Sequence, residues 1–175
     1  IDYPKYYYPY EFRKTVCLDF DLKSYNNFKE VIEYYQKKIE LDNTNLKAYF
    51  TIGNCNYHLS EYTKAIDYYK KVIELDNTNL KGHISLGNCN YHLKEYEKAI
   101  EYYIQAFELC KNSSSILWSI IKIKDDLGLT GEKDTIQYLK QAIEIDNQHP
   151  SIYLSLSING EESIKKKSYK KAIYF

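Results

Sequence analysis

The sequence has no methionine, only three prolines and a single tryptophan, and no net charge, because 24 basic residues balance 24 acidic ones. A balanced charge disfavours long-range steering toward nucleic acid, which a strongly basic chain would provide. No apolar run approaches the about 20 residues that a membrane-spanning helix needs, and the first residues lack the apolar core of a secretory signal. These absences predict a chain that does not insert into a membrane, and they argue against nucleic acid as its partner.

Cysteine is also scarce. The four cysteines, Cys17, Cys55, Cys89 and Cys110, are too few and too regularly spaced for a disulfide framework, so a reducing, cytoplasmic location is expected. The 21 tyrosines, together with abundant asparagine, lysine and isoleucine, are typical of AT-rich codon usage and predict a eukaryotic source such as a protist. A start without methionine and a stop inside a repeat suggest a segment of a longer chain.

No catalytic constellation can be found in the sequence: it has no nucleophile with a base and an orienting acid, and no glycine loop that could cradle phosphate. Cys55-x-x-His58, repeated as Cys89-x-x-His92, would supply the Cys2His2 set that zinc prefers. Free cysteine inside a helix also behaves as a small buried hydrophobe, and we favour that interpretation. The sequence therefore predicts a protein that is not an enzyme and holds no cofactor and no metal.

A tandem repeat dominates the chain. Residues 41–74 and 75–108 agree at 22 of 34 positions. A fixed period of this length is the mark of stacked repeats, each of which buries its apolar face against the next. Stacked repeats of this kind build an extended surface.

Each repeat contains two helical patterns. Tyr49, Ile52 and Gly53 lie at helical spacing, and residues 62–73 repeat the three-and-four spacing of an amphipathic helix. A break is expected near Ser60. The DNTN sequence at residues 42–45 and 76–79 is expected to end one helix and cap the next, since short polar side chains bond to neighbouring backbone groups. The repeat is therefore a helix hairpin.

At these positions the chain resembles the tetratricopeptide repeat family, whose units are about 34 residues long. The first copy matches the family pattern at Tyr49, Ile52-Gly53, Tyr62-Thr63-Lys64-Ala65 and Tyr69, and the second at His83, Leu86-Gly87, Tyr96-Glu97-Lys98-Ala99, Tyr103 and Ala106. The resemblance implies an all-α fold of tandem helix-turn-helix repeats stacked into a right-handed superhelix, an α-solenoid. Trp118 is expected to restore the leading aromatic of the following unit, after which an insertion of one or two residues lengthens the turn.

The predicted organisation has two parts. Residues 1–11 form an extended segment rich in tyrosine and proline, and residues 12–175 form the repeat domain. The repeat units are expected at about residues 12–45, 46–79, 80–113, 114–149 and 150–175, and the last of them is incomplete.

In this family the leading helices of successive hairpins line a concave face, which nominates ten partner-binding residues. They are Lys47, Phe50, Asn54, Tyr57 and His58, with their equivalents Lys81, Ile84, Asn88, Tyr91 and His92. Amide and imidazole donors beside phenol rings suit an extended or helical peptide. We expect the two asparagine amides to be exposed. Tyr57 and Tyr91 either line the groove or pack between helices, and groove exposure is favoured.

A specific version of the family binds the acidic tails of heat-shock chaperones through a carboxylate clamp. In one frame its positions hold Phe50 and Asn54, then Ser85, then Ile116 and Ile120. In the other they hold Val16 and Phe20, then Thr51, then Lys81 and Ser85. Neither frame supplies the complete set of cations, so chaperone C-terminal tails are disfavoured.

The predicted function is protein–protein interaction, as a scaffold that binds a peptide or a partner subunit within a larger assembly. Two alternatives stay open. The segment could be the substrate-recruiting arm of an enzyme whose catalytic domain lies outside these residues. It could instead bind RNA, as related helical repeats do, although the neutral charge argues against this.

Overall fold

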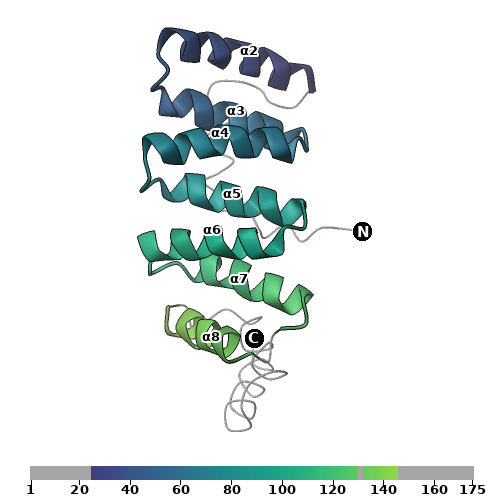
Figure 1. The fold of residues 1–175 in the computed structure, drawn as a ribbon, viewed down its shortest axis with the longest axis vertical. Coiled ribbons are helices and arrows are strands. Elements are labelled where there is room, and N and C mark those ends of the chain that lie inside the picture. Colours follow the sequence, from purple (N-terminus) through teal and green to yellow (C-terminus); the bar gives the residue numbers. More distant parts are fainter. Residues whose placement is uncertain (1–24, 130–131, 146–175) are drawn as a thin grey trace. The chain divides into compact units, whose positions relative to one another are not determined.

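The computed structural model describes residues 25–129 and 132–145, and every regular element within them is a helix (Figure 1). In chain order these are α2 (Tyr25–Leu41), α3 (Leu46–His58), α4 (Tyr62–Leu75), α5 (Leu80–His92), α6 (Tyr96–Leu109), α7 (Ser114–Asp126) and α8 (Lys133–Ile145). The expected all-α class is confirmed. Within the described ranges, none of the helices combines the length and the apolar character that crossing a bilayer requires. The segment 1–11, the leading helix expected before residue 25 and the unit 150–175 lie outside the described residues.

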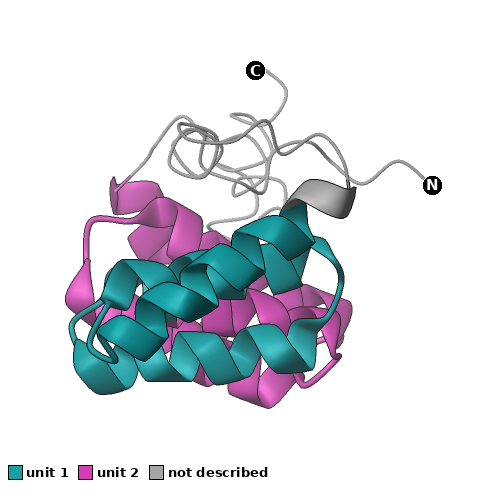
Figure 2. Cartoon of the chain, turned by 90° about the horizontal axis from the view of Figure 1, so that it is seen from above, with its two compact units in different colours: residues 1–82 teal, residues 83–175 magenta. Residues whose placement is uncertain are grey.

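The chain divides into two compact units, residues 1–82 and residues 83–175 (Figure 2). In the first unit, α3 packs against both α2 and α4. In the second unit, α7 packs against both α6 and α8. Sequential helices are therefore neighbours in space within each unit, as short connections between antiparallel helices require.

Small side chains and one tyrosine on each of the trailing helices α4 and α6 form the cores of their hairpins. Ala65, Tyr69 and Val72 of α4 are at most 1% exposed, and their equivalents on α6 are buried as well. The alanines leave room for the leading helix to come close, so the large tyrosine ring fills the space that remains. On α8 the same three positions hold Thr135, Leu139 and Ala142, all fully buried.

The DNTN turns cap the leading helices as the sequence predicted. The side chain of Asn45 accepts a hydrogen bond from the backbone N–H of Ala48 at 3.0 Å, and Asn79 accepts one from Gly82 at 3.0 Å. Asp42 accepts bonds from the backbone N–H and the hydroxyl of Thr44, which shapes the turn before the cap. These bonds satisfy donors that the first helical turn leaves without a partner.

In the third hairpin, formed by α7 and α8, the leading helix keeps the repeat register and the trailing helix is shifted. The α7 helix begins one repeat length after α5, at Ser114 against Leu80, so Leu117, which is fully buried, occupies the place of His83. The expectation that Trp118 is the leading aromatic is therefore wrong by one residue. The buried positions of α8 follow those of α6 by more than one repeat length, as from Tyr103 to Leu139, so the connection before α8 contains two extra residues.

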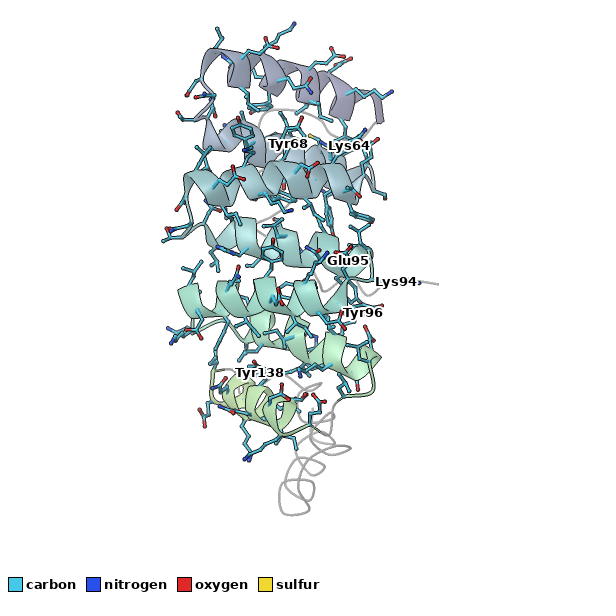
Figure 3. All side chains as sticks on the ribbon, in the orientation of Figure 1. Lys64, Tyr68, Lys94, Glu95, Tyr96 and Tyr138 are labelled. Carbon is cyan, nitrogen blue, oxygen red and sulfur yellow. The ribbon has the colours of Figure 1, made fainter. Side chains whose placement is uncertain are left out.

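Two non-glycine residues adopt left-handed backbone conformations where a leading helix turns into a trailing one. Ser60 and Lys94 both have φ of 61°. Figure 3 shows Lys94 and Glu95 in the turn that precedes Tyr96, the first residue of α6. The turn is held by a backbone bond from Glu61 to Asn56 and by the equivalent bond from Glu95 to Asn90, both at 2.9 Å.

Glycine at either position is expected to stabilise the protein. A left-handed conformation costs an L-residue about 1–2 kcal/mol, and part of that gain is lost because glycine is more flexible in the unfolded chain. Ser60→Gly and Lys94→Gly should each raise the free energy of unfolding by about 0.5–1 kcal/mol. Urea denaturation measures this, with Ser60→Ala and Lys94→Ala as controls that keep the strain. Alanine variants as stable as the glycine variants would show that the backbone conformation is not the cause.

Candidate functional site

The ten nominated residues lie on α3 and α5, but their exposure differs. Lys47 and His58 of α3 are exposed and Phe50 is half-buried. On α5, Lys81 and His92 are exposed, whereas Ile84, Asn88 and Tyr91 are half-buried. Asn54 is only 1% exposed, so the expectation that its amide lies open is wrong. The face of α5 is therefore the more accessible of the two.

The nominated tyrosines pack against neighbouring rings. Tyr57 is 7% exposed, and its ring contacts that of Tyr62 edge-on, with the centroids 5.4 Å apart. Packing between helices, rather than groove exposure, is the correct interpretation for Tyr57. Tyr91 remains half-buried, with its ring 5.8 Å from that of Tyr96. Its hydroxyl donates a hydrogen bond to Asp126 at 3.0 Å.

A hydrogen bond joins the trailing helix to the asparagine in both repeats. The hydroxyl of Tyr69 donates to Oδ1 of Asn54 at 2.7 Å, and Tyr103 donates to Oδ1 of Asn88 at 2.6 Å. The tyrosine ring reaches the asparagine by crossing the glycine that precedes it. A Cβ atom built on Gly87 would lie 2.8 Å from Cε1 of Tyr103, which is closer than real contacts allow. Glycine is therefore required because the ring occupies the space of its missing side chain.

The histidines at the end of each leading helix are held in their neutral form. Although both residues are exposed as a whole, partial removal of water from the imidazole lowers the pKa of His58, whose ring stacks on Phe28 with centroids 5.7 Å apart. The same partial desolvation lowers the pKa of His92, and the positive charge of Lys122 lowers it further. At neutral pH both imidazoles therefore offer one donor and one acceptor rather than a charge.

The cysteines of the two Cys-x-x-His pairs are enclosed. Cys55 and Cys89 are fully buried, and burial raises the pKa of each thiol to about 12. A protonated thiol is a poor metal ligand, since the thiolate is the form that binds. Within residues 25–129 and 132–145, no group of three or more histidine, cysteine or acidic side chains has the geometry to hold a metal ion.

Two residues of α7 join the candidate site in the second unit, and the sequence analysis missed them. The ammonium of Lys122 lies 5.6 Å from the centroid of the Tyr91 ring, within the range of a cation–π interaction. Asp126 accepts the Tyr91 hydroxyl bond. Lys122 and Asp126 follow Asn88 and His92 by one repeat length. Counting that length from those two residues finds them, but the misplaced Trp118 register concealed the correspondence.

Comparison with known proteins agrees with the repeat architecture. Residues 46–79 and 80–113 each match the tetratricopeptide repeat family. Among curated proteins, none matches the sequence. The fold is similar to that of MamA, with a TM-score of 0.73, 22% identity and coverage of 85% of this chain and 88% of that one.

Two further solved structures have the same fold. YrrB, described as a TPR protein with an unusual peptide-binding site, gives a TM-score of 0.70 at 20% identity, covering 93% of this chain and 80% of that one. The first TPR of Spaghetti (RPAP3), solved with the HSP90 peptide SRMEEVD, gives 0.56 at 20% identity, covering 59% and 82%. These likenesses establish an α-solenoid fold, and residues 46–113 contain two units that match the tetratricopeptide repeat family.

Proposed function

We propose that the leading-helix faces bind a peptide segment of a partner protein, and that the chain serves as an interaction scaffold. The repetition of one chemical pattern on α3 and α5 carries this proposal. Each helix presents an exposed lysine, a partly buried apolar side chain and an exposed neutral histidine at equivalent positions. A pattern that recurs on two exposed faces suits a ligand that is itself a repeating chain, as a polypeptide backbone is.

The face of α5 has the groups that peptide recognition needs. Ile84 offers a half-buried apolar contact, and Asn88 and His92 offer hydrogen bonds. Binding energy at such surfaces is concentrated in a few partly enclosed anchors, with exposed charges contributing less. We therefore expect Ile84 to matter more to affinity than Lys81.

Relatives in fold support a peptide ligand. YrrB is described as having a peptide-binding site, and the Spaghetti repeat was solved with a bound peptide. The identity is too low to transfer either ligand to this chain. Membership of a larger assembly, a cytoplasmic location and a eukaryotic source remain proposals that rest on the sequence.

A chaperone tail is disfavoured as the ligand. With the corrected register of α7, the clamp positions that require cations hold Ser115 and Ser119 instead of Ile116 and Ile120. The Ser119 hydroxyl donates to the backbone carbonyl of Ser115 at 3.1 Å, as Thr51 donates to Lys47. Serine at these positions cannot neutralise a terminal carboxylate.

Selection from a random peptide library on the full chain tests the proposal. We expect a selected peptide whose affinity falls at least about tenfold in Ile84→Asp, since a buried charge opposes an apolar contact. Gln105→Asp adds the same charge on an exposed position of the trailing helix α6 and should leave the affinity unchanged. The peptide SRMEEVD should show no saturable binding below about 1 mM.

Two results would contradict the proposal. The first is a library that yields no binding peptide. The second is a selected peptide whose affinity is equal for wild type and Ile84→Asp while both melt alike, which would place the interface elsewhere. Saturable binding of SRMEEVD would instead restore a chaperone-tail ligand.

A further inference from the structure

The carboxamide of asparagine can face a partner in two ways. It can present its NH2 group, which donates hydrogen bonds, or its oxygen, which accepts them. A surface asparagine that turns freely accommodates both kinds of group and so selects neither. The environment of Asn88 removes this freedom, because Tyr103 occupies its oxygen with a hydrogen bond of 2.6 Å.

We propose that Tyr103 is a positioning residue that fixes Asn88 as a hydrogen-bond donor, so that the site selects a carbonyl of an extended peptide backbone. The inference rests on the proposed function and specifies which kind of hydrogen-bonding group the ligand presents to Asn88. Asn88 is half-buried, so part of the residue remains accessible to a ligand. Because the oxygen of the amide accepts the bond from Tyr103, the NH2 group is the end of the carboxamide that can face a partner's carbonyl oxygen.

The tyrosine is itself held in place, as a positioning residue must be. Its side chain is 4% exposed and lies against Gly87, whose missing Cβ gives the ring its space. A ring confined in this way cannot withdraw its hydroxyl without repacking the hairpin core. The amide is therefore oriented before a ligand arrives, which avoids the entropic cost of ordering it on binding.

The third hairpin, α7 with α8, lacks all three of these residues. At the positions of Gly87, Asn88 and Tyr103 it carries Ile121, Lys122 and Leu139. Both Ile121 and Leu139 are fully buried and belong to one apolar cluster. Where the tyrosine is absent, the glycine and the asparagine are absent too, and the leading helix carries a cation instead.

The first repeat provides a matched control. Tyr69 donates the same hydrogen bond to Asn54, but Asn54 is 1% exposed and cannot reach a ligand. Tyr69→Phe removes the equivalent bond and should reduce stability at least as much as Tyr103→Phe, because it leaves the Asn54 oxygen buried without a donor. Only Tyr103→Phe should weaken binding if the tyrosine acts by orienting an accessible amide.

Nuclear magnetic resonance of the free chain tests the orientation without any ligand. With Oδ1 facing the tyrosine, the Nδ2 protons of Asn88 point away from the Tyr103 ring. Weak or absent Overhauser contacts from these protons to the ring Hε protons are expected in wild type. Strong contacts would show the reversed amide and would overturn the proposal even if peptides bind.

A double-mutant cycle tests the role in binding, with a peptide selected from the random library as the probe. Tyr103→Phe should lower the affinity about three- to tenfold, the cost of one poorly oriented hydrogen bond. The same substitution should have no further effect in an Asn88→Ala background, since the tyrosine acts through the amide. Asn88→Asp keeps an acceptor for the tyrosine but replaces the donor with a second acceptor, and should abolish binding.

The outcomes separate this proposal from the proposed function. A peptide that binds wild type and Tyr103→Phe with equal affinity would contradict the positioning role of Tyr103 but not the proposal that this surface binds peptides. An equal loss in Tyr69→Phe and Tyr103→Phe would mean that both tyrosines act through stability alone. If no peptide binds wild type, the peptide surface and the positioning role are both wrong.

Discussion

Gly53→Leu should destabilise the protein more than any exposed substitution in the same hairpin. A Cβ atom on Gly53 would lie 2.7 Å from Cε1 and 2.8 Å from Cδ1 of Tyr69. The ring cannot move aside easily, because Tyr69 is 1% exposed and its hydroxyl is bonded to Asn54. Overpacking costs about 1–3 kcal/mol, and leaving the buried Asn54 oxygen without its donor costs about 1–3 kcal/mol more. The expected loss in the free energy of unfolding is therefore about 2–6 kcal/mol, measured by urea denaturation.

The third hairpin suggests a rescue variant. There the positions of Gly87 and Tyr103 are filled by Ile121 and Leu139, both fully buried. Gly87→Ile should be as damaging as Gly53→Leu, but Gly87→Ile combined with Tyr103→Leu should recover part of the loss because the smaller side chain makes room. A single variant that unfolds like wild type, or a double variant no better than the single, would contradict this account of the hairpin packing.

The helix hairpins were predictable because the repeat is written twice. The repeat period set the length of each unit, and the DNTN turns marked the helix starts that the structure confirms at Leu46 and Leu80. The third hairpin was harder to place, because a large aromatic at residue 118 was more conspicuous than the buried Leu117 that holds the equivalent position. Burial, rather than residue size, sets the register there.

The candidate site was less predictable for a physical reason. Sequence spacing identifies the face of a helix on which a residue lies, but not what a neighbouring helix places over it. Asn54 and Asn88 are identical by spacing, yet one is enclosed and the other is half-buried. The tyrosine bond to each amide joins residues 15 positions apart, from two different helices, and no local pattern indicates it.

Breaking the ion pairs of Lys124 is expected to have the second large effect on the free energy of unfolding. Its side chain is 10% exposed, and its ammonium lies 2.6 Å from Oδ2 of Asp134 and 3.1 Å from Oε2 of Glu132. The two carboxylates are about half exposed, at 53% and 48%. The two ways of breaking the ion pairs should therefore have unequal costs. If the lysine is substituted, the two carboxylates that are left can be hydrated. If the acids are substituted, the ammonium that is left stays enclosed.

The double variant Glu132→Ala with Asp134→Asn should therefore cost more than Lys124→Met. Breaking a buried pair while leaving its charge enclosed costs about 3–5 kcal/mol, and we expect about 2–4 kcal/mol here because the ammonium can partly reach water. Asparagine at position 134 can still accept the backbone bond from Thr135, which isolates the loss of charge. Lys124→Met fills the same volume without charge and should cost less than about 1.5 kcal/mol.

The pH dependence of stability provides an independent measurement of the same contacts. Burial opposes the charge of Lys124, but hydrogen bonds to Asp134 and Glu132 outweigh it and raise the pKa of the lysine above its ordinary value of 10.5. The bond from Lys124 lowers the pKa of Asp134 below 3.8. A raised lysine pKa stabilises the fold up to about pH 10.5 and a lowered aspartate pKa stabilises it above about pH 3.8. The stabilisation of wild type by these ion pairs should therefore be lost only above about pH 10.5 or below about pH 3.8.

If Lys124→Met is less stable at neutral pH than the double variant that lacks both acids, the ion pairs are not what retains the lysine in the core.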